Sequence, residues 1–276
     1  MPLSDGGEGT LAAFAWAFGG EERIATASDP LGREVEAAWL LLPDGRAVIE
    51  SAQAIGLSLL APEERAPLRA SSRGLGELML AAAEESAELV VGLGDSAVVD
   101  GGAGLRECLG ELPLPTTVLC DVRAPLGAAA LVFAAQKGAT PEDREELARR
   151  IAAMRELQPF ADLPGAGAAG GLGAALAALG AKLVPGAEYV VDAVGLRKGI
   201  RGAQLVVTGE GVVDATSLEG KVAATVASLC AEEGVRCAIF GGRVEVELPV
   251  AEMHPLSGDP VRAWMDLAAL GEALGR

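Results

Sequence analysis

Short apolar runs separated by glycine-rich or charged segments organise this chain. Residues 88–92 and 117–120 contain uninterrupted apolar runs of the kind that fill buried parallel strands. Similar runs occupy residues 189–191, 204–208 and 236–240, and most of them alternate with segments of helical character. This alternation predicts an α/β fold with largely parallel strands.

The first fifty residues depart from that rhythm. An apolar helix is expected over residues 10–18, followed by strands over 23–27 and 34–42. The turn sequence Pro43-Asp44-Gly45 then leads into a strand over 46–50, which predicts a locally antiparallel hairpin.

Two further helices have clear signals. Residues 74–86 read as a helix that leads into the 88–92 strand. Thr140 is a strong N-cap before Pro141 and two acids, and this helix is expected to run to about residue 157.

We expect two α/β domains from these elements. The first is a Rossmann-like parallel sheet domain, and the second is a smaller α/β domain that contains the antiparallel strands. The expected boundaries are 1–22, 52–112 and 201–276 for the Rossmann-like domain, and 23–51 and 113–200 for the smaller domain.

Composition excludes several classes of function. Among the 276 residues, 22 basic against 39 acidic side chains give a net charge of −17, which disfavours nucleic-acid binding. The apolar runs are too short to span a membrane, and four cysteines without paired spacing indicate reduced thiols, so we expect a cytoplasmic protein. The single histidine, His254, precedes a proline and is expected in a solvated loop, which disfavours Ser-His-Asp catalysis.

Glycine-rich stretches with an acid, a hydroxyl or a lysine recur along the chain. Glycine lets backbone amides approach an anion closely, so such loops between strands and helices suit a phosphate-handling site. The five stretches are residues 5–10, 92–104, 137–138, 165–173 and 209–221.

Known nucleotide motifs fit only in part. Gly92-Leu-Gly94 follows a strand as a dinucleotide motif would, but no second strand ending in an acid follows at the required distance. The Gly165-Ala-Gly167-Ala-Ala-Gly170 segment could point amides at an anion or could serve close helix packing. Gly211 and Gly220 lie too far apart for a Walker A loop.

Acids and lysines beside these glycines are the candidate catalytic groups. Phosphoryl transfer needs carboxylates that hold Mg²⁺ and one that accepts a hydroxyl proton, and a lysine can meet a phosphate. The candidates are Asp5, Glu8, Asp100, Asp121, Lys137 and Asp214.

Taken in order, the motifs resemble those of the bacterial type I glycerate kinases. The segments that carry the resemblance are Ser4-Asp-Gly-Gly-Glu-Gly-Thr10, Gly92 to Gly104, Gln136-Lys-Gly-Ala-Thr-Pro141, Pro164 to Gly173, and Thr208-Gly-Glu-Gly211 with Asp214, Ser217, Gly220 and Lys221. The resemblance implies phosphorylation of D-glycerate by ATP with Mg²⁺, at the 2-hydroxyl, in a two-lobed α/β protein. The expected cofactor-binding residues are Gly6, Gly7, Ser96, Gly101, Gly102, Gly165, Gly167, Gly170, Gly171, Glu210 and Lys221.

Three departures from the family pattern keep an alternative open. The given chain begins at the Asp-Gly-Gly-Glu-Gly motif, where the family has an earlier strand and helix, and an uncovered sheet edge would favour a homodimer. The family's Gly-Gly-Ser-Ala-Thr-Asn-Asp-Gly-Gly reads Gly94-Asp-Ser-Ala-Val-Val-Asp-Gly-Gly102 here, and the segments around residues 110–116 and 121–133 are shorter. The alternative is a catalytically degraded relative that binds a metabolite or nucleotide, and a nucleotide-dependent dehydrogenase is a third, remoter reading.

Overall fold

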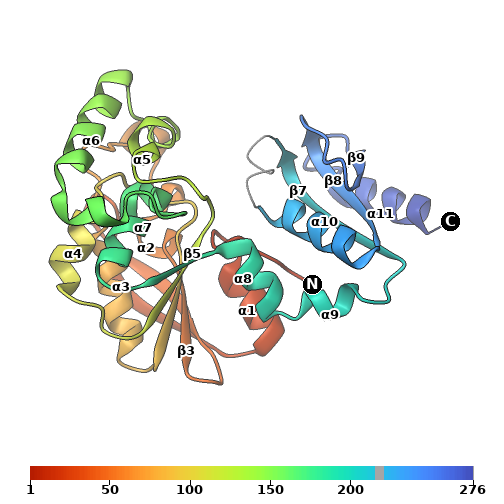
Figure 1. Ribbon diagram of the computed structural model, residues 1–276, viewed down its shortest axis with the longest axis horizontal. Helices are drawn as coiled ribbons and strands as arrows, with labels where there is room; N and C mark the ends of the chain where they lie inside the picture. Colours follow the sequence, from red (N-terminus) through yellow and green to blue (C-terminus); the bar gives the residue numbers. More distant parts are fainter. Residues whose placement is uncertain (215–220, 276) are drawn as a thin grey trace. The chain divides into compact units, whose positions relative to one another are not determined.

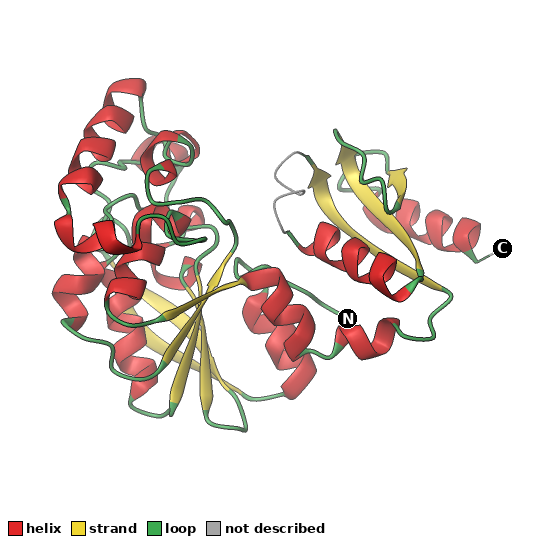
Figure 2. Ribbon diagram, viewed as in Figure 1, coloured by secondary structure: helices red, strands yellow, loops and turns green. Residues whose placement is uncertain are grey.

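The computed structural model describes residues 1–214 and 221–275, and the chain divides into two compact units, 1–190 and 191–276 (Figure 1). Each unit has its own β-sheet with helices packed against it (Figure 2). The α/β class predicted from the alternating apolar runs is therefore confirmed. Because each unit is internally compact, the two are described separately below.

The N-terminal unit is built on a mixed sheet with the strand order β1-β2-β3-β4-β5-β6 among the described residues. The strands are β1 (Glu21–Ser28), β2 (Glu34–Leu41), β3 (Arg46–Glu50), β4 (Glu88–Gly92), β5 (Thr116–Cys120) and β6 (Lys182–Pro185). Pairs β1/β2 and β2/β3 are antiparallel, as the turn signals predict, whereas β3 to β6 run parallel. The parallel strands bring their carboxyl ends to one edge of the sheet.

Helices of this unit lie on both faces of the sheet and beside its carboxyl edge (Figure 1). They are α1 (Thr10–Phe18), α2 (Ala52–Ile55), α3 (Arg73–Ala83), α4 (Ala103–Leu109), α5 (Ala128–Leu131), α6 (Pro141–Ala153), α7 (Ala168–Ala178) and α8 (Gly186–Ala193). Helix α3 buries Leu75, Leu78 and Met79 against Trp39 and Ile49 of the sheet. Helix α1 packs against β2 and β3 and buries Phe14.

A second apolar cluster forms beside the sheet from α5, α6 and α7. Leu126, Leu147 and Leu157 are buried in it together with alanines of α7. Helix α6 begins as predicted, because the Thr140 hydroxyl accepts a hydrogen bond from Asp143 N and the Asp143 carboxylate accepts one from Thr140 N. The helix ends at Ala153, and residues 155–160 continue as a 3₁₀ helix.

The C-terminal unit has a parallel sheet with the order β7-β8-β9 in its described part. Its strands are β7 (Leu205–Val213), β8 (Arg236–Val244) and β9 (Glu252–Pro255), and its helices are α9 (Leu196–Ile200), α10 (Val222–Glu233) and α11 (Ala263–Leu274). Helix α10 packs against β7 and β8 and buries Val226 and Cys230.

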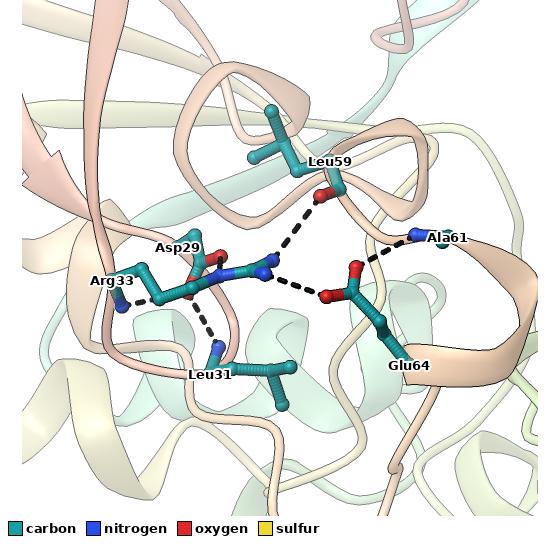
Figure 3. Close-up of polar contacts among 6 residues, drawn as sticks. All are labelled: Asp29, Leu31, Arg33, Leu59, Ala61 and Glu64. Carbon is teal, nitrogen blue, oxygen red and sulfur yellow. Dashed lines mark hydrogen bonds and ion pairs between the residues drawn. The ribbon is translucent and has the colours of Figure 1, made fainter.

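The turn between β1 and β2 is fixed to the segment after α2 by a polar network (Figure 3). The buried Asp29 carboxylate accepts hydrogen bonds from Leu31 N, Arg33 N and Arg33 Nε. The Arg33 guanidinium also bonds Glu64 at 2.7 Å and the Leu59 carbonyl at 3.4 Å. The network joins two loops that are about thirty residues apart in sequence.

Some sequence-based expectations differ from the structure. Residues 189–191 lie in α8 and not in a strand, while the strand at this place is β6, Lys182–Pro185. His254 lies in β9 opposite Phe240, so it is a strand residue and not a loop residue. The large sheet joins segments that were assigned to two different domains, because β1 to β3 pair in series with β4.

The cysteines and the helix lengths bear on the thiol state and on membrane spanning. All four cysteines lie within the described residues and are free thiols. No helix of the described chain is both long and apolar enough to cross a bilayer.

Candidate active site

The candidate site of the N-terminal unit forms where the 5–10 loop lies on the carboxyl ends of β4 and β5. Gly94 N donates a hydrogen bond to Gly6 O at 3.1 Å. A Cβ atom on Gly92 would lie 2.2 Å from Gly6 O, and one on Gly94 would lie 2.3 Å from Gly7 Cα. Only glycine permits this approach of one backbone to another, so these glycines position the loop directly on the sheet.

Hydrogen bonds of hydroxyl groups connect the two ends of the 5–10 loop. Ser4 Oγ and Thr10 Oγ1 are 2.7 Å apart, and Thr10 Oγ1 donates to Gly7 O, also at 2.7 Å. Asp5 Oδ1 accepts a hydrogen bond from Gly7 N at 3.3 Å. The loop therefore presents the Asp5 carboxylate at the sheet edge in a fixed backbone conformation.

Asp95 holds the same loop from the β4 side. Its backbone has a left-handed conformation with φ of 60°, and its Oδ2 accepts a hydrogen bond from Glu8 N at 2.9 Å. A Cβ on Gly7 would lie only 2.6 Å from that oxygen. Asp95 was a departure from the family motif in the sequence, and in the structure its carboxylate secures the loop that carries Asp5.

Lys137 is the buried cation of the site. Its side chain is 8% exposed, and its ammonium donates to Ser96 Oγ at 3.0 Å and to Val98 O at 2.7 Å. Burial lowers the pKa of Lys137 to about 8, while the charges of Asp121 and Asp100 act in the opposite direction. At neutral pH most molecules therefore hold a charged ammonium here.

Asp121 follows directly after β5, and its carboxylate interacts electrostatically with the Lys137 ammonium. Burial, together with the negative charges of Asp5 and Asp95, raises the pKa of Asp121 to about 6, although Lys137 opposes the shift. Its Oδ1 atom is buried without a hydrogen-bond partner in the described part of the chain. A carboxylate that has an unsatisfied oxygen and a pKa near neutrality is well suited to accept a proton.

Asp100 has a different environment. Its carboxylate accepts hydrogen bonds from Ser72 N, Ser72 Oγ, Gly102 N and Gly104 N at 2.8 to 3.1 Å. These four donors fix the start of α4 to the segment before α3. The arrangement favours a structural anchor over a group that exchanges protons with a substrate.

The glycines of the second and fourth motifs serve close packing. Gly101 N bonds Gly170 O at 3.1 Å, Gly102 N bonds Asp100 and Gly167 N bonds Ala124 O at 2.9 Å. Gly6 N and Gly7 N likewise bond Ser4 and Asp5. These five amides are already engaged inside the protein, so their geometry favours the packing interpretation over the phosphate cradle expected from sequence.

The turn at the start of α7 explains the remaining glycines of that motif. Ala169, Gly170 and Gly171 have positive φ in succession, and a Cβ on Gly170 would lie 2.2 Å from Val98 O. A Cβ on Gly165 would lie 2.6 Å from Cys120 Sγ. The turn therefore packs on both the 96–101 loop and the end of β5, next to Lys137 and Asp121.

The two valines that replace hydrogen-bonding residues of the family are part of the core. Val98 and Val99 are buried, and Val98 contributes its carbonyl oxygen, not its side chain, to Lys137. Ser96 is kept, and it contributes its hydroxyl to the same cation. The departure at positions 98 and 99 thus leaves the ligands of Lys137 intact.

The other predicted residues have contacts of their own or belong to the second unit. Glu8 is exposed and accepts a hydrogen bond from Ser58 Oγ at 3.1 Å. Glu210, Asp214 and Lys221 belong to the C-terminal unit, where Lys221 is the N-cap residue of α10. Ser217 and Gly220 of the same motif lie outside the described residues.

Two supporting side chains were missed in the sequence. The buried Glu50 ends β3, and it accepts hydrogen bonds from Leu11 N at 2.8 Å and Gln53 Nε2 at 3.2 Å, which ties α1 to the sheet edge. Ser72 holds Asp100. An acid that directly ends an apolar strand was the available signal for Glu50, whereas nothing local marks Ser72.

The arrangement combines a buried ammonium, an unsatisfied carboxylate and a second carboxylate at one sheet edge. Such a set can remove a proton from a hydroxyl and offset the negative charge of a transferred group. Within the described residues, no group of three or more His, Cys, Asp or Glu side chains has a metal-binding arrangement. The cluster thus suits group transfer between small anionic molecules.

Comparison with known proteins agrees with this chemistry. The family model described as the glycerate kinase family matches residues 1–114 and 111–258. The chain is 37% identical to the glycerate 2-kinase of Escherichia coli K12 over 92% of this chain and 78% of that protein, and 36% identical to the glycerate kinase of Halalkalibacterium halodurans over 88% and 75%. A crystal structure of a candidate glycerate kinase 2 from Salmonella typhimurium LT2 superposes with a TM-score of 0.75 at 34% identity, covering 92% of this chain and 80% of that one. The chain therefore belongs to the glycerate kinase family.

Proposed function

We propose that the protein transfers the γ-phosphoryl group of ATP to the 2-hydroxyl of D-glycerate and releases 2-phosphoglycerate. Support comes from membership of the family and from relatives that are named glycerate kinase or glycerate 2-kinase over most of this chain. The observation that carries the proposal is the buried Lys137 beside the unsatisfied Asp121. The free thiols fit the reducing cytoplasm, where we place the reaction.

Asp121 is the proposed base. Its pKa of about 6 leaves the carboxylate mostly ionised at neutral pH, yet basic enough to accept the proton of the attacking hydroxyl. Its Oδ1 atom is buried and has no hydrogen-bond partner among the residues that the structure describes, so it is the atom that would take this proton. The negative charge of Asp5 contributes to the raised pKa of Asp121.

Lys137 is the proposed electrostatic partner of the anions. Its ammonium is held by one hydroxyl and one carbonyl oxygen, which leaves the third donor for a ligand oxygen. A charged donor in a buried position stabilises the negative charge on a carboxylate or a transferring phosphoryl group more strongly than one in water.

Magnesium fits this site as a companion of the nucleotide. Mg²⁺ is commonly bound through one or two carboxylates together with phosphate oxygens, so a dedicated cage of three protein ligands is not required. Asp5 is the carboxylate that would hold it together with phosphate oxygens, because it lies at the same sheet edge as Asp121, whose Oδ1 takes the proton. The ion would neutralise charge on the phosphates.

The direct test is a coupled assay of ADP release with D-glycerate and Mg²⁺-ATP. The wild-type protein should turn over, and Asp121→Asn should lose about 10²- to 10⁴-fold in kcat because the neutral amide cannot accept the proton. Asp162→Asn, at an exposed position of the same unit, is the matched control and should retain full activity.

The assay also decides between an enzyme and a non-catalytic relative. A folded protein that shows no turnover, but whose melting temperature rises with ADP or glycerate, would be a binding protein that lost catalysis. Product analysis separates 2-phosphoglycerate from 3-phosphoglycerate, and formation of the 3-isomer would contradict the proposed position of transfer.

A further inference from the structure

The C-terminal unit contains a groove that the N-terminal cluster does not explain. It has a volume of about 710 Å³ and is formed by the carboxyl halves of β7 and β8, the segment 256–260 and the start of α11. Ligand sites of α/β proteins commonly occur at this end of parallel strands, and this volume lies in the range of small-molecule pockets.

A carboxylate oxygen of Glu210 in the groove has no hydrogen-bond partner among the described residues. Glu210 lines the groove from β7, and its Oε1 atom is buried without a hydrogen bond to any residue that the structure describes. A buried acceptor that has lost water and gained no donor is rare in folded proteins. Such an oxygen can accept a hydrogen bond from a hydroxyl or amino group of a ligand.

The charges in the groove disfavour an anionic occupant. Among the described residues, its lining contains the carboxylates of Glu210, Asp259 and Asp266 and one cation, Arg243. Arg243 is itself paired with Glu245 at 2.9 Å. A phosphate or carboxylate would meet net repulsion here, so the groove suits a neutral group with hydrogen-bond donors.

Apolar side chains give the groove its shape. Phe240, Leu256 and Leu267 line it, and a Cβ on Gly209 would lie 2.5 Å from Phe240 Cδ2, so the phenyl ring packs directly on bare backbone. Gly258 would bring a Cβ to 3.1 Å from Gly242 O, which shows that two more lining segments meet through their backbones. An apolar wall with one aromatic ring accommodates a flat, uncharged ring system.

We propose that this groove binds a nucleoside, with Glu210 accepting a hydrogen bond from a ribose hydroxyl or from the amino group of the base. The role of that nucleoside as part of the phosphate donor rests on the proposed function, whereas the binding itself does not. The nucleotide's phosphates lie outside the groove, because its acidic lining repels them.

Calorimetric titration of the full-length protein with adenosine tests the proposal. Wild type should bind saturably, and Glu210→Met, which removes the acceptor, should weaken binding at least about tenfold. Glu210→Gln keeps a neutral acceptor and should recover most of the affinity. The exposed Glu247→Gln, which lies outside the groove, is the control and should bind as wild type does.

Thermal melting distinguishes a loss of adenosine binding from a loss of folding in these variants. Glu210→Met removes an unsatisfied buried oxygen, so its ligand-free melting temperature should equal or exceed that of wild type while the shift caused by adenosine shrinks. Inosine and 2′-deoxyadenosine, compared with adenosine, identify whether the base amino group or the ribose hydroxyl donates to Glu210.

The outcomes separate this inference from the proposed function. Adenosine binding that depends on Glu210, without any glycerate turnover, would support the groove and contradict the kinase. Turnover with an unchanged KM for ATP in Glu210→Met would overturn the groove and leave the kinase standing. Absence of adenosine binding by wild type would also overturn the inference.

Discussion

The charged cluster of the N-terminal unit and the groove of the C-terminal unit occupy similar places on their sheets but differ in chemistry. Both lie toward the carboxyl ends of parallel strands. The cluster contains a buried ammonium with two oxygen ligands, and two carboxylates whose charges interact. The groove has apolar walls, a net acidic lining and one unsatisfied oxygen.

This difference indicates that the sheet edge of the N-terminal unit is suited to proton transfer, and that of the C-terminal unit to binding a ligand by its shape. A proton transfer needs paired groups whose pKa values lie near neutrality, which Asp121 and Lys137 supply. Recognition of a neutral ring needs apolar contact and a few fixed hydrogen bonds. Experiments that disturb one site and spare the other test this division.

The largest effect is expected from removing the cation. Lys137→Met should lower kcat/KM by about 10²- to 10⁴-fold, because the anions of substrate and donor lose their buried counter-charge. Steady-state kinetics with glycerate and ATP measure the loss, and adenosine binding should be unchanged. Lys182→Met, at an exposed lysine of β6, is the control. Activity within about threefold of wild type in Lys137→Met would remove the cluster from catalysis.

The pH profile of kcat/KM should have two limbs. Asp121 must be ionised to accept a proton, so activity should rise as pH increases through about 6. Lys137 must be charged, so activity should fall as pH increases through about 8. Each limb should approach tenfold per pH unit. A profile flat from about pH 5 to about pH 9 would contradict both assignments.

Asp95 should have a smaller effect through the 5–10 loop. Asp95→Gly removes the acceptor for Glu8 N, so KM for glycerate should rise about three- to tenfold as the loop loses its anchor. Asp95→Asn keeps an acceptor and tolerates the left-handed backbone, so it should restore most of the affinity. Equal kinetics in the two variants would show that the hydrogen bond does not position the loop.

The smallest effect on activity is expected from the network in Figure 3. Asp29→Ala should lower the free energy of unfolding by about 1–3 kcal/mol, since Arg33 and two amides lose a buried acceptor, while activity per folded molecule stays within about twofold. Urea unfolding and kinetics measure the two quantities. A large loss of activity in correctly folded Asp29→Ala would contradict the purely structural role.

The same network makes stability depend on acid. Burial would raise the pKa of Asp29, but hydrogen bonds from Arg33 and Leu31 outweigh it and hold the pKa below its usual value of 3.8. The folded state therefore binds this proton less readily than the unfolded state, so the stabilisation is present above pH 3.8 and is lost as pH falls below it. Asp29→Ala should lack this part of the acid dependence.

Local signals in the sequence predicted the regular elements well. The turn at 43–45, the cap at Thr140 and the apolar run at 88–92 each determine a local conformation, and all three features appear in the structure. The strand expected at 189–191 was wrong, because a short apolar run fits a buried helix as well as a strand. Strand β6 was missed because Lys182 and Pro185 at its ends are poor strand residues.

The sequence indicated which residues are candidates for the site, but not how they contact one another. Asp121 and Lys137 were candidates because of their neighbours in sequence, but the contact between Lys137 and Ser96 spans 41 positions and follows from tertiary packing. The glycines were interpreted as phosphate ligands, whereas many of them allow one backbone to touch another, which sequence alone does not distinguish. Glu210 was an expected cofactor-binding residue, but the groove around it is formed by segments 210–212, 240–243 and 256–267, which only the fold brings together.

The backbone contact between Gly6 and Gly94 limits how the enzyme can be redesigned. Two side chains in contact can reorient to absorb a substitution, but two bare main chains have no such freedom. Any displacement of β4 is therefore passed on to the carboxylate of Asp5. Libraries that aim at longer hydroxy acids should keep these glycines fixed and diversify side chains at positions where the backbone is not in such contact.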